Sequence, residues 1–228
     1  SFVERSGIAN QMFLNILQAT LTEKNLNLEK NFHTPDKIHS ITDDKTILCS
    51  FSLTEHEHLP NWLLHAHSVI LIEPATREDG RKLLKTREQL IEQGFHIAAP
   101  CTHQQACPLL NKSEHDWCHD RIHIKMPNWF KQIEKLLPMK NENLTFSYLL
   151  ALKNKPDEQK QNQNWRITGD TQIEKGKSRQ LICRGPEREF ISWMHRKFPK
   201  DAVIPRGLEI EFSEIENVKL ENKGQELR

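Results

Sequence analysis

Long apolar runs and an excess of one charge are both missing from this sequence. No segment reaches the roughly 18 consecutive apolar residues that predict a transmembrane helix. The 228 residues include 32 Lys and Arg against 31 Asp and Glu, so the net charge is close to zero. An overall electrostatic attraction to nucleic acid is therefore excluded, and any RNA contact has to come from a local basic patch.

Hydrophobic residues and glycine are also scarce. Hydrophobic residues make up 36% of the chain, below the usual share for a globular domain, so several segments are expected to lie in solvent or against a partner. The first 98 residues contain only Gly7, Gly80 and Gly94, in no cofactor-loop pattern. Five cysteines, an odd number without a secretory pattern, argue against a disulfide framework and for reduced thiols.

The first 98 residues alternate between two patterns. Short apolar runs typical of buried strands are followed by stretches with apolar residues at helical spacing. Gly94 stands where it would end the last of these helices. Strands alternating with helices predict a parallel, doubly wound sheet, so the expected fold class is α/β. The expected strands are 1–4, 46–51, 68–74 and 95–98, and the expected helices are 7–21, 61–64 and 78–94.

The pattern changes at Pro100. Residues 101–121 have little periodicity and concentrate Cys and His. We divide the chain into an α/β unit at 1–98, a cysteine-rich metal-binding segment with a helix at 99–138, a β-rich domain at 139–212 and a charged tail at 213–228. The later expected helices are 126–137 and 187–196, the expected strands are 144–152, 165–167, 179–183 and 207–212, and 153–164 is a polar loop.

Four of the five cysteines predict a metal site. Cys101, Cys107 and Cys118 lie within 18 residues, and Cys183 follows much later. A single buried cysteine is more often a small apolar side chain, and Cys49, inside an apolar strand, is interpreted in this way. The close spacing of three, flanked by histidines and prolines, favours ligands instead. The flanking histidines are His103, His115 and His119.

The identity of the metal stays open between zinc and an iron–sulfur cluster. Thiolates are soft ligands that suit both. Zinc sites usually use pairs separated by two to four residues, whereas the gaps here are five and ten residues, which favours a cluster. His103 or His119 could replace one thiolate, although a supporting role or an RNA contact is the preferred interpretation.

Signals for a nucleotide cofactor or for catalysis are weak. Glu4, at the end of the first predicted strand, stands where α/β folds bind a ribose, and Ser50, at the end of the next, could line the same crevice. A capping or surface role is several times more common for such a glutamate. No nucleophile–base pair stands out, so no catalytic residue is predicted.

Several motifs of the chain resemble one protein family. The motifs are Glu73-Pro74-Ala75-Thr76, Ala99-Pro100-Cys101-Thr102-His103, Cys107-Pro108-Leu109, Asp116-Trp117-Cys118-His119 and Phe146-Ser147-Tyr148-Leu149, followed by Arg166-Ile167 and Leu181-Ile182-Cys183. In this order they resemble the methyltransferase-like assembly factors of the mitochondrial small ribosomal subunit and their bacterial relatives. The resemblance covers about residues 45–185.

The resemblance implies a fold, a cofactor and a partner. The fold is a partial class I methyltransferase (Rossmann-like) parallel sheet, followed by the metal-binding loops and a small β-rich domain. The cofactor is a 4Fe-4S cluster on Cys101, Cys107, Cys118 and Cys183. The partner is small-subunit rRNA or a pre-ribosomal particle, in the mitochondrial matrix or the bacterial cytoplasm, with no membrane association and an unknown oligomeric state.

The chain also departs from the family pattern. Thr102 replaces a proline, Asp120 replaces an aromatic residue and Ala75 replaces a glycine. The interval between the second and third cysteines is longer than in the family, and the glycine-rich loop for S-adenosylmethionine does not occur in the sequence. The resemblance thus implies weak binding of S-adenosylmethionine at most, and whether the chain is an enzyme stays open.

Three functions are carried forward. The first is an RNA-binding assembly factor with a structural cluster, the second an S-adenosylmethionine-dependent rRNA methyltransferase, and the third a zinc-stabilised interaction module. For RNA, the interspersed acidic residues leave a solvated face as the alternative, and Trp117, Trp165 and Trp193 are candidate stacking partners. The candidate RNA-binding residues are Arg121, Arg166, Lys177, Arg179 and Arg184.

Overall fold

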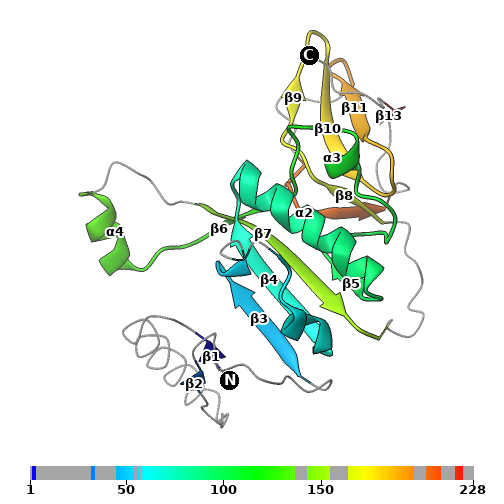
Figure 1. The fold of residues 1–228 in the computed structure, drawn as a ribbon. Helices are drawn as coiled ribbons and strands as arrows, with labels where there is room; N and C mark the ends of the chain where they lie inside the picture. The colour runs from blue at the N-terminus through cyan, green and yellow to red at the C-terminus, as the bar shows by residue number, and fades with distance from the viewer. Residues whose placement is uncertain are drawn as a thin grey trace.

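The computed structural model describes residues 2–3, 32–33, 45–53, 56, 58–136, 143–154, 164–197, 204–211 and 219–222. These residues form a mixed α/β structure with two main sheets (Figure 1), which confirms the α/β fold class. A short parallel pair joins β1 (Phe2–Val3) to β2 (Phe32–His33). The helix expected at 7–21 and Glu4 lie outside the described residues.

The first sheet is mixed rather than fully parallel. Its strands are β3 (Thr46–Ser50), β4 (Ser68–Pro74), β7 (Asn143–Leu152) and β5 (His96–Ala99) in spatial order, and β6 (Asp120–His123) pairs with the start of β7. Strands β3 and β4 are parallel, but β7 lies antiparallel between β4 and β5. The sequence places β7 in a later β-rich domain, because local pattern does not reveal which strand a segment pairs with.

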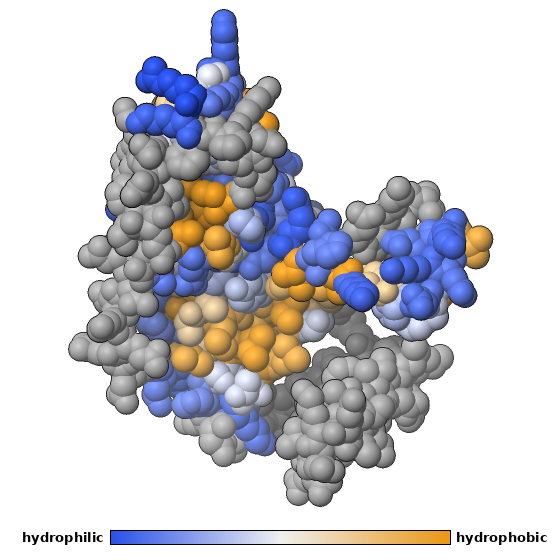
Figure 2. All heavy atoms as spheres, turned by 180° about the vertical axis from the view of Figure 1, so that it is seen from behind, coloured by the Kyte–Doolittle hydropathy of each residue, from blue (hydrophilic) through white to orange (hydrophobic). Residues whose placement is uncertain are grey.

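One face of this sheet is covered by α2 (Arg77–Glu92), as the sequence predicts. Thr76 caps the helix by accepting a hydrogen bond from the Asp79 backbone N–H at 3.1 Å, and Gly94 ends it with φ +84°. Val69 and Leu71 of β4 are fully buried on the helix side, whereas Ile70 and Ile72, which alternate with them, are partly exposed. Figure 2 shows apolar side chains gathered on the opposite face.

The second sheet is antiparallel throughout its described pairs. Its strands are β8 (Asn164–Ile167), β9 (Gln172–Ile173), β10 (Lys177–Cys183), β11 (Glu189–Met194), β12 (Glu209–Glu211) and β13 (Lys219–Asn222). The helix expected at 187–196 is wrong: β11 pairs with β10 over six residues and buries Phe190, Ile191 and Trp193. Tertiary pairing overrides the weak helical pattern there. The edge strand expected at 207–212 is confirmed as β12.

The cysteine-rich segment fills the space between the two sheets. It contains the short helix α3 (Pro108–Asn111), and α4 (Asn128–Glu134) follows further along, where a helix is predicted. The 3-10 helix η3 (Asn61–His65) precedes β4. An apolar cluster joins Leu84 of α2 to Cys107 and Leu109 of the segment and to Leu181 and Phe190 of the second sheet. No helix of the described chain is long and apolar enough to cross a bilayer.

Helix α2 approaches the cysteine segment most closely at Gly80. A Cβ at this position would lie 2.5 Å from Trp117 Cδ1 and 3.2 Å from Ser147 Oγ. Alanine is a better helix former than glycine by about 1 kcal/mol, but the clash outweighs this gain. Gly80→Ala is therefore expected to lower the free energy of unfolding by about 1–3 kcal/mol in urea denaturation. A more stable variant would contradict the close packing.

Candidate metal centre

The structure places the four predicted ligands at the ends of elements that meet between the sheets. Cys101 follows β5, Cys107 is the N-cap of α3, Cys118 precedes β6 and Cys183 is the last residue of β10. All four are free thiols; Cys107 and Cys183 are buried and the other two half-buried. Cys49 lies apart, in the core beside α2.

Direct contacts join the Cys101 loop to the end of β10. The Thr102 hydroxyl donates to the Cys183 carbonyl at 3.2 Å. The His103 Nε2 atom lies 3.3 Å from the Cys183 sulfur. Burial, and then the Arg87 guanidinium, lower the pKa of His103 to about 4, so its ring is neutral. Two segments some 80 residues apart in sequence are thus in contact where the ligand set was predicted.

The four thiols influence one another electrostatically. Burial is the main cause that raises the pKa of Cys107 to about 11 and of Cys118 to about 12. The same burial raises the pKa of Cys183 well above its ordinary value, and the Cys101, Cys107 and Cys118 thiols each raise it further. These thiols stay protonated unless a nearby positive charge compensates for the cost of ionising them. A bound metal supplies such a charge.

The spacing of these groups differs from that of a single-ion site. Among the described residues, no three Cys, His, Asp or Glu side chains are grouped as the ligands of one metal ion are. The four thiols nevertheless lie in one region, because Cys107 and Cys118 pack in the same apolar cluster as Leu181 and the Cys101 loop contacts Cys183. A set of four free thiols, with soft sulfur donors, is the chemistry that an iron–sulfur cluster requires.

Arg81 of α2 holds the loop that carries the second and third cysteines. Its Nη1 atom donates to three backbone carbonyls, those of Leu109 at 3.1 Å, Ser113 at 2.9 Å and Asp116 at 2.9 Å. In an irregular loop, few backbone carbonyls are paired with backbone N–H groups. The guanidinium of Arg81 supplies hydrogen bonds to these carbonyls and so fixes the loop conformation.

Arg87 and Glu88 hold the first part of the same segment. Arg87 is fully buried, and its Nη2 atom donates to the His103 and Gln105 carbonyls at 2.8 and 2.9 Å. The Glu88 carboxylate accepts from Arg87 and from the Cys107 backbone N–H, both at 2.9 Å. One turn of α2 therefore positions the loops of two predicted ligands.

A polar network lies beside Cys118, on β6 and β8. Asp120 accepts a hydrogen bond from the buried guanidinium of Arg166. Next to it, the exposed Asp170 pairs with the exposed Arg121 at 3.4 Å and with the nearly buried Arg206 at 3.3 Å. Asp120, which replaces the family's aromatic residue, therefore pairs with Arg166. This ion pair links the first sheet to the second.

The five candidate RNA-binding residues are not on one open surface. Arg166 and Arg179 are buried, and Arg179 pairs with Glu174 at 2.8 Å and stacks on Phe190. Lys177 is about one-quarter exposed and lies 3.8 Å from the same glutamate. Arg184 pairs with Glu189 and covers Trp165, and Arg121 pairs with Asp170. Their charges are largely engaged within the protein.

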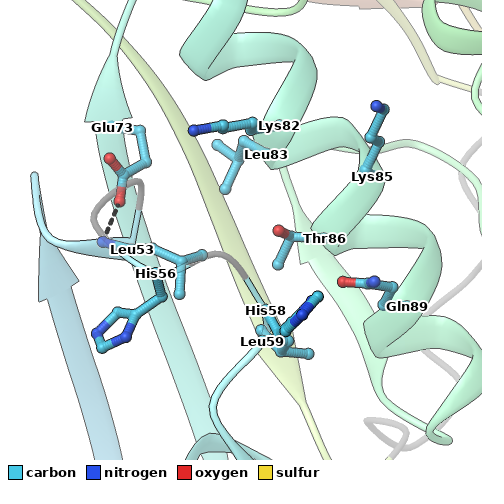
Figure 3. A pocket seen from close by; sticks show the side chains of 10 residues that line it. All are labelled: Leu53, His56, His58, Leu59, Glu73, Lys82, Leu83, Lys85, Thr86 and Gln89. Atoms are coloured by element: carbon cyan, nitrogen blue, oxygen red, sulfur yellow. Dashed lines mark hydrogen bonds between the residues drawn. The ribbon is translucent and has the colours of Figure 1, made fainter.

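A small cavity lies at the carboxyl ends of β3 and β4, beside α2 (Figure 3). Its volume is about 130 Å³, and the buried Glu73 carboxylate accepts from the Leu53 backbone N–H at 3.0 Å on its wall. Its other lining residues are His56, His58, Leu59, Lys82, Leu83, Lys85, Thr86 and Gln89. Residues 54, 55 and 57 of the adjoining loop lie outside the described chain, so we assign no ligand here.

The described residues do not supply a fit to S-adenosylmethionine. Glu4 lies outside them, and Ser50 is exposed at the end of β3, with no described residue from a glycine-rich loop beside it. No step of methyl transfer is therefore derived for this chain.

Comparison with known proteins decides the family. A family model described as mitochondrial small ribosomal subunit Rsm22 matches residues 14–195. The chain belongs to the Rsm22 family. The resemblance noted in the sequence is thereby confirmed, and the matched region of this Rsm22-family chain includes all four predicted ligands. No match occurs among curated proteins.

Membership connects this Rsm22-family chain to the small ribosomal subunit and so to translation. The family description is mitochondrial, and nothing supports the expected alternative of a bacterial cytoplasm.

The arginines that hold the cysteine loops were not identified from the sequence. Arg87 stands four residues after Leu83 and three after Leu84, both of which were expected to face inward. Helical spacing therefore places Arg87 on the buried side, and a charged residue there signals a buried partner.

Proposed function

We propose that this chain is an assembly factor of the mitochondrial small ribosomal subunit that binds rRNA or a pre-ribosomal particle in the matrix. Its fold is methyltransferase-like, and a structural 4Fe-4S cluster on Cys101, Cys107, Cys118 and Cys183 joins its two sheets. Family membership supports the connection to the small subunit. The observation that carries the cluster is that the Cys101 loop contacts Cys183, while Cys107 and Cys118 pack in one apolar cluster with Leu181 of the same strand.

The role of the cluster is to join loops that have few apolar contacts of their own. Three ligands lie on the segment between β5 and β6, and the fourth lies at the end of β10. A cluster bound there would form iron–thiolate bonds, and these bonds would compensate for the free-energy cost of ionising buried thiols. The surrounding arginines then fix the backbone, and the second sheet stays attached to the first.

One end of the second sheet carries exposed basic residues that suit RNA. Lys175, Arg196 and Lys197 are exposed there, next to the half-buried Lys177. The His195 backbone N–H donates to the Gly176 carbonyl at 3.0 Å, which brings the β9–β10 turn beside the end of β11. Positive side chains gathered in this way are suited to phosphate contacts, so we place the RNA surface here rather than at the engaged arginines.

Charge reversal at this end tests the proposal. In Lys175→Glu/Arg196→Glu, binding to labelled mitochondrial small-subunit rRNA is expected to weaken uniformly across sequence segments. The slope of log affinity against log salt should fall in magnitude by about 2, about one for each lost phosphate contact. Fluorescence anisotropy over a salt series measures both quantities.

The matched control reverses two exposed lysines of α2. Lys82→Glu/Lys85→Glu makes the same change in net charge beside the cavity at the carboxyl ends of β3 and β4, rather than at the β9–β10 turn. Its salt slope should equal that of the unaltered chain. Equal slopes for all three proteins, or equal weakening in the two variants, would reject the proposed RNA surface.

A further inference from the structure

We propose that Arg87 tunes the reduction potential of the cluster through a hydrogen bond to the Cys101 sulfur. Arg87 is in this sense a positioning residue, and its role rests on the cluster proposed above. The Arg87 Nε atom donates to Cys101 Sγ at 3.1 Å, close enough for an N–H···S hydrogen bond.

The orientation of the Arg87 guanidinium is fixed on every side. Its Nη2 atom is held by two loop carbonyls, those of His103 and Gln105, and its Nη1 atom by the Glu88 carboxylate at 2.9 Å. These partners leave Nε directed at the sulfur. Because the side chain is fully buried, no water competes for the sulfur contact.

The charge of Arg87 also acts on the ligand set. Its Nε atom lies 3.1 Å from the Cys101 sulfur, a distance at which the cation attracts a negatively charged sulfur. Arg87 and the sulfurs thus stabilise one another when the sulfurs are negative. Glu88 offsets part of the positive charge, yet it is partly exposed while Arg87 is buried against Cys101.

This arrangement favours the reduced cluster. Reduction adds an electron, which is shared with the ligand sulfurs and makes them better hydrogen-bond acceptors. Hydrogen bonds to the sulfurs and limited exposure to solvent are among the factors that set the potential of iron–sulfur clusters. A fixed N–H donor with a positive charge therefore raises the potential at which this cluster takes up its electron.

Three variants separate the hydrogen bond from the charge and from loop support. Arg87→Gln removes the charge and the Nε donor. Arg87→Lys keeps the charge but loses the planar fork that aims Nε at the sulfur. Arg81→Lys is the control, since Arg81 also holds loop carbonyls from α2 but donates to no sulfur. Each anaerobically purified full chain is titrated while the visible spectrum and the electron paramagnetic resonance signal are recorded.

We expect Arg87→Gln to make the cluster about tenfold harder to reduce, a shift of about 59 mV to lower potential for one electron. Arg87→Lys should shift the potential in the same direction by less, and Arg81→Lys, which loosens a ligand loop without touching a sulfur, should shift it less than Arg87→Lys does. If Arg87→Gln yields no folded protein, the comparison of Arg87→Lys with Arg81→Lys decides.

Two failures are distinguishable. An iron-loaded Arg87→Lys chain with the unaltered potential, or Arg87 and Arg81 variants shifted equally, overturns the role of Arg87 and leaves the cluster in place. An unaltered chain without iron overturns the proposed cluster, and with it this role.

Discussion

Cys183→Ala is expected to lose most of the iron that the unaltered chain binds. A 4Fe-4S cluster gives about four iron atoms per chain and a brown protein when purified without oxygen. Cys183 is the ligand that comes from the second sheet, whereas the other three come from one segment. Removing it leaves a site with three thiolates that no longer joins the two sheets. Iron analysis and the visible spectrum measure the effect.

The control for this variant is Cys49→Ala. Cys49 is buried in β3, in the core cluster that includes Leu71 and Leu83, and burial and Glu73 are the causes that raise its pKa. It should keep the full iron content and the same spectrum. Full iron in Cys183→Ala, or equal loss in both variants, would contradict the ligand assignment. A colourless protein with one bound zinc ion would reject the iron–sulfur cluster and support the zinc-stabilised interaction module instead.

Arg166→Met is expected to lower the free energy of unfolding by about 3–5 kcal/mol. The Arg166 side chain is 3% exposed and Asp120 is 13% exposed, so the substitution leaves a carboxylate with little solvent and no cation. The loss arises mainly from that unpaired charge rather than from the bond itself. Urea denaturation of the metal-loaded protein measures it.

Two further variants test this reason. Arg121→Met breaks the neighbouring pair with Asp170, where the side chains are 44% and 56% exposed, and should lower the free energy of unfolding by less than about 1 kcal/mol. In Asp120→Asn/Arg166→Met the uncompensated charge is gone, so the double variant should recover a large part of the loss. Equal losses in Arg166→Met and Arg121→Met would refute the argument from burial.

Secondary structure is predicted best from the sequence where the residues of a single segment determine its conformation. β4 has seven residues, with the four apolar residues Val69–Ile72 in a row and a proline at its end, and the sequence predicts both of its bounds correctly. Helix α2 was predicted to within two residues because periodicity and Gly94 agree. The prediction for β11 is wrong because its strand conformation depends on pairing with β10. Its aromatic and β-branched residues become buried only in that pairing.

Most contacts between segments that are distant in sequence cannot be predicted in the same way. The spacing of the cysteines predicted the ligand set, and the structure brings the Cys101 loop to Cys183. Helical spacing places Arg87 on the buried side of α2, but the sequence does not reveal which loops Arg81 and Arg87 hold, because hydrogen bonds to backbone carbonyls do not depend on the side chains of the partner. Two of its candidate RNA-binding residues, Arg166 and Arg179, are basic in sequence but buried in the fold.

The position of β7 in the middle of the first sheet sets the order in which the protein can fold. β7 pairs with β4 and with β5, although some 40 residues separate its start from the end of β5. A nascent chain that stops before residue 143 has two apolar strands with unpaired backbone edges, which favour self-association. Because these contacts are distant in sequence, closure of the sheet is slow, and a fragment cut after α4 is a poor choice for expression.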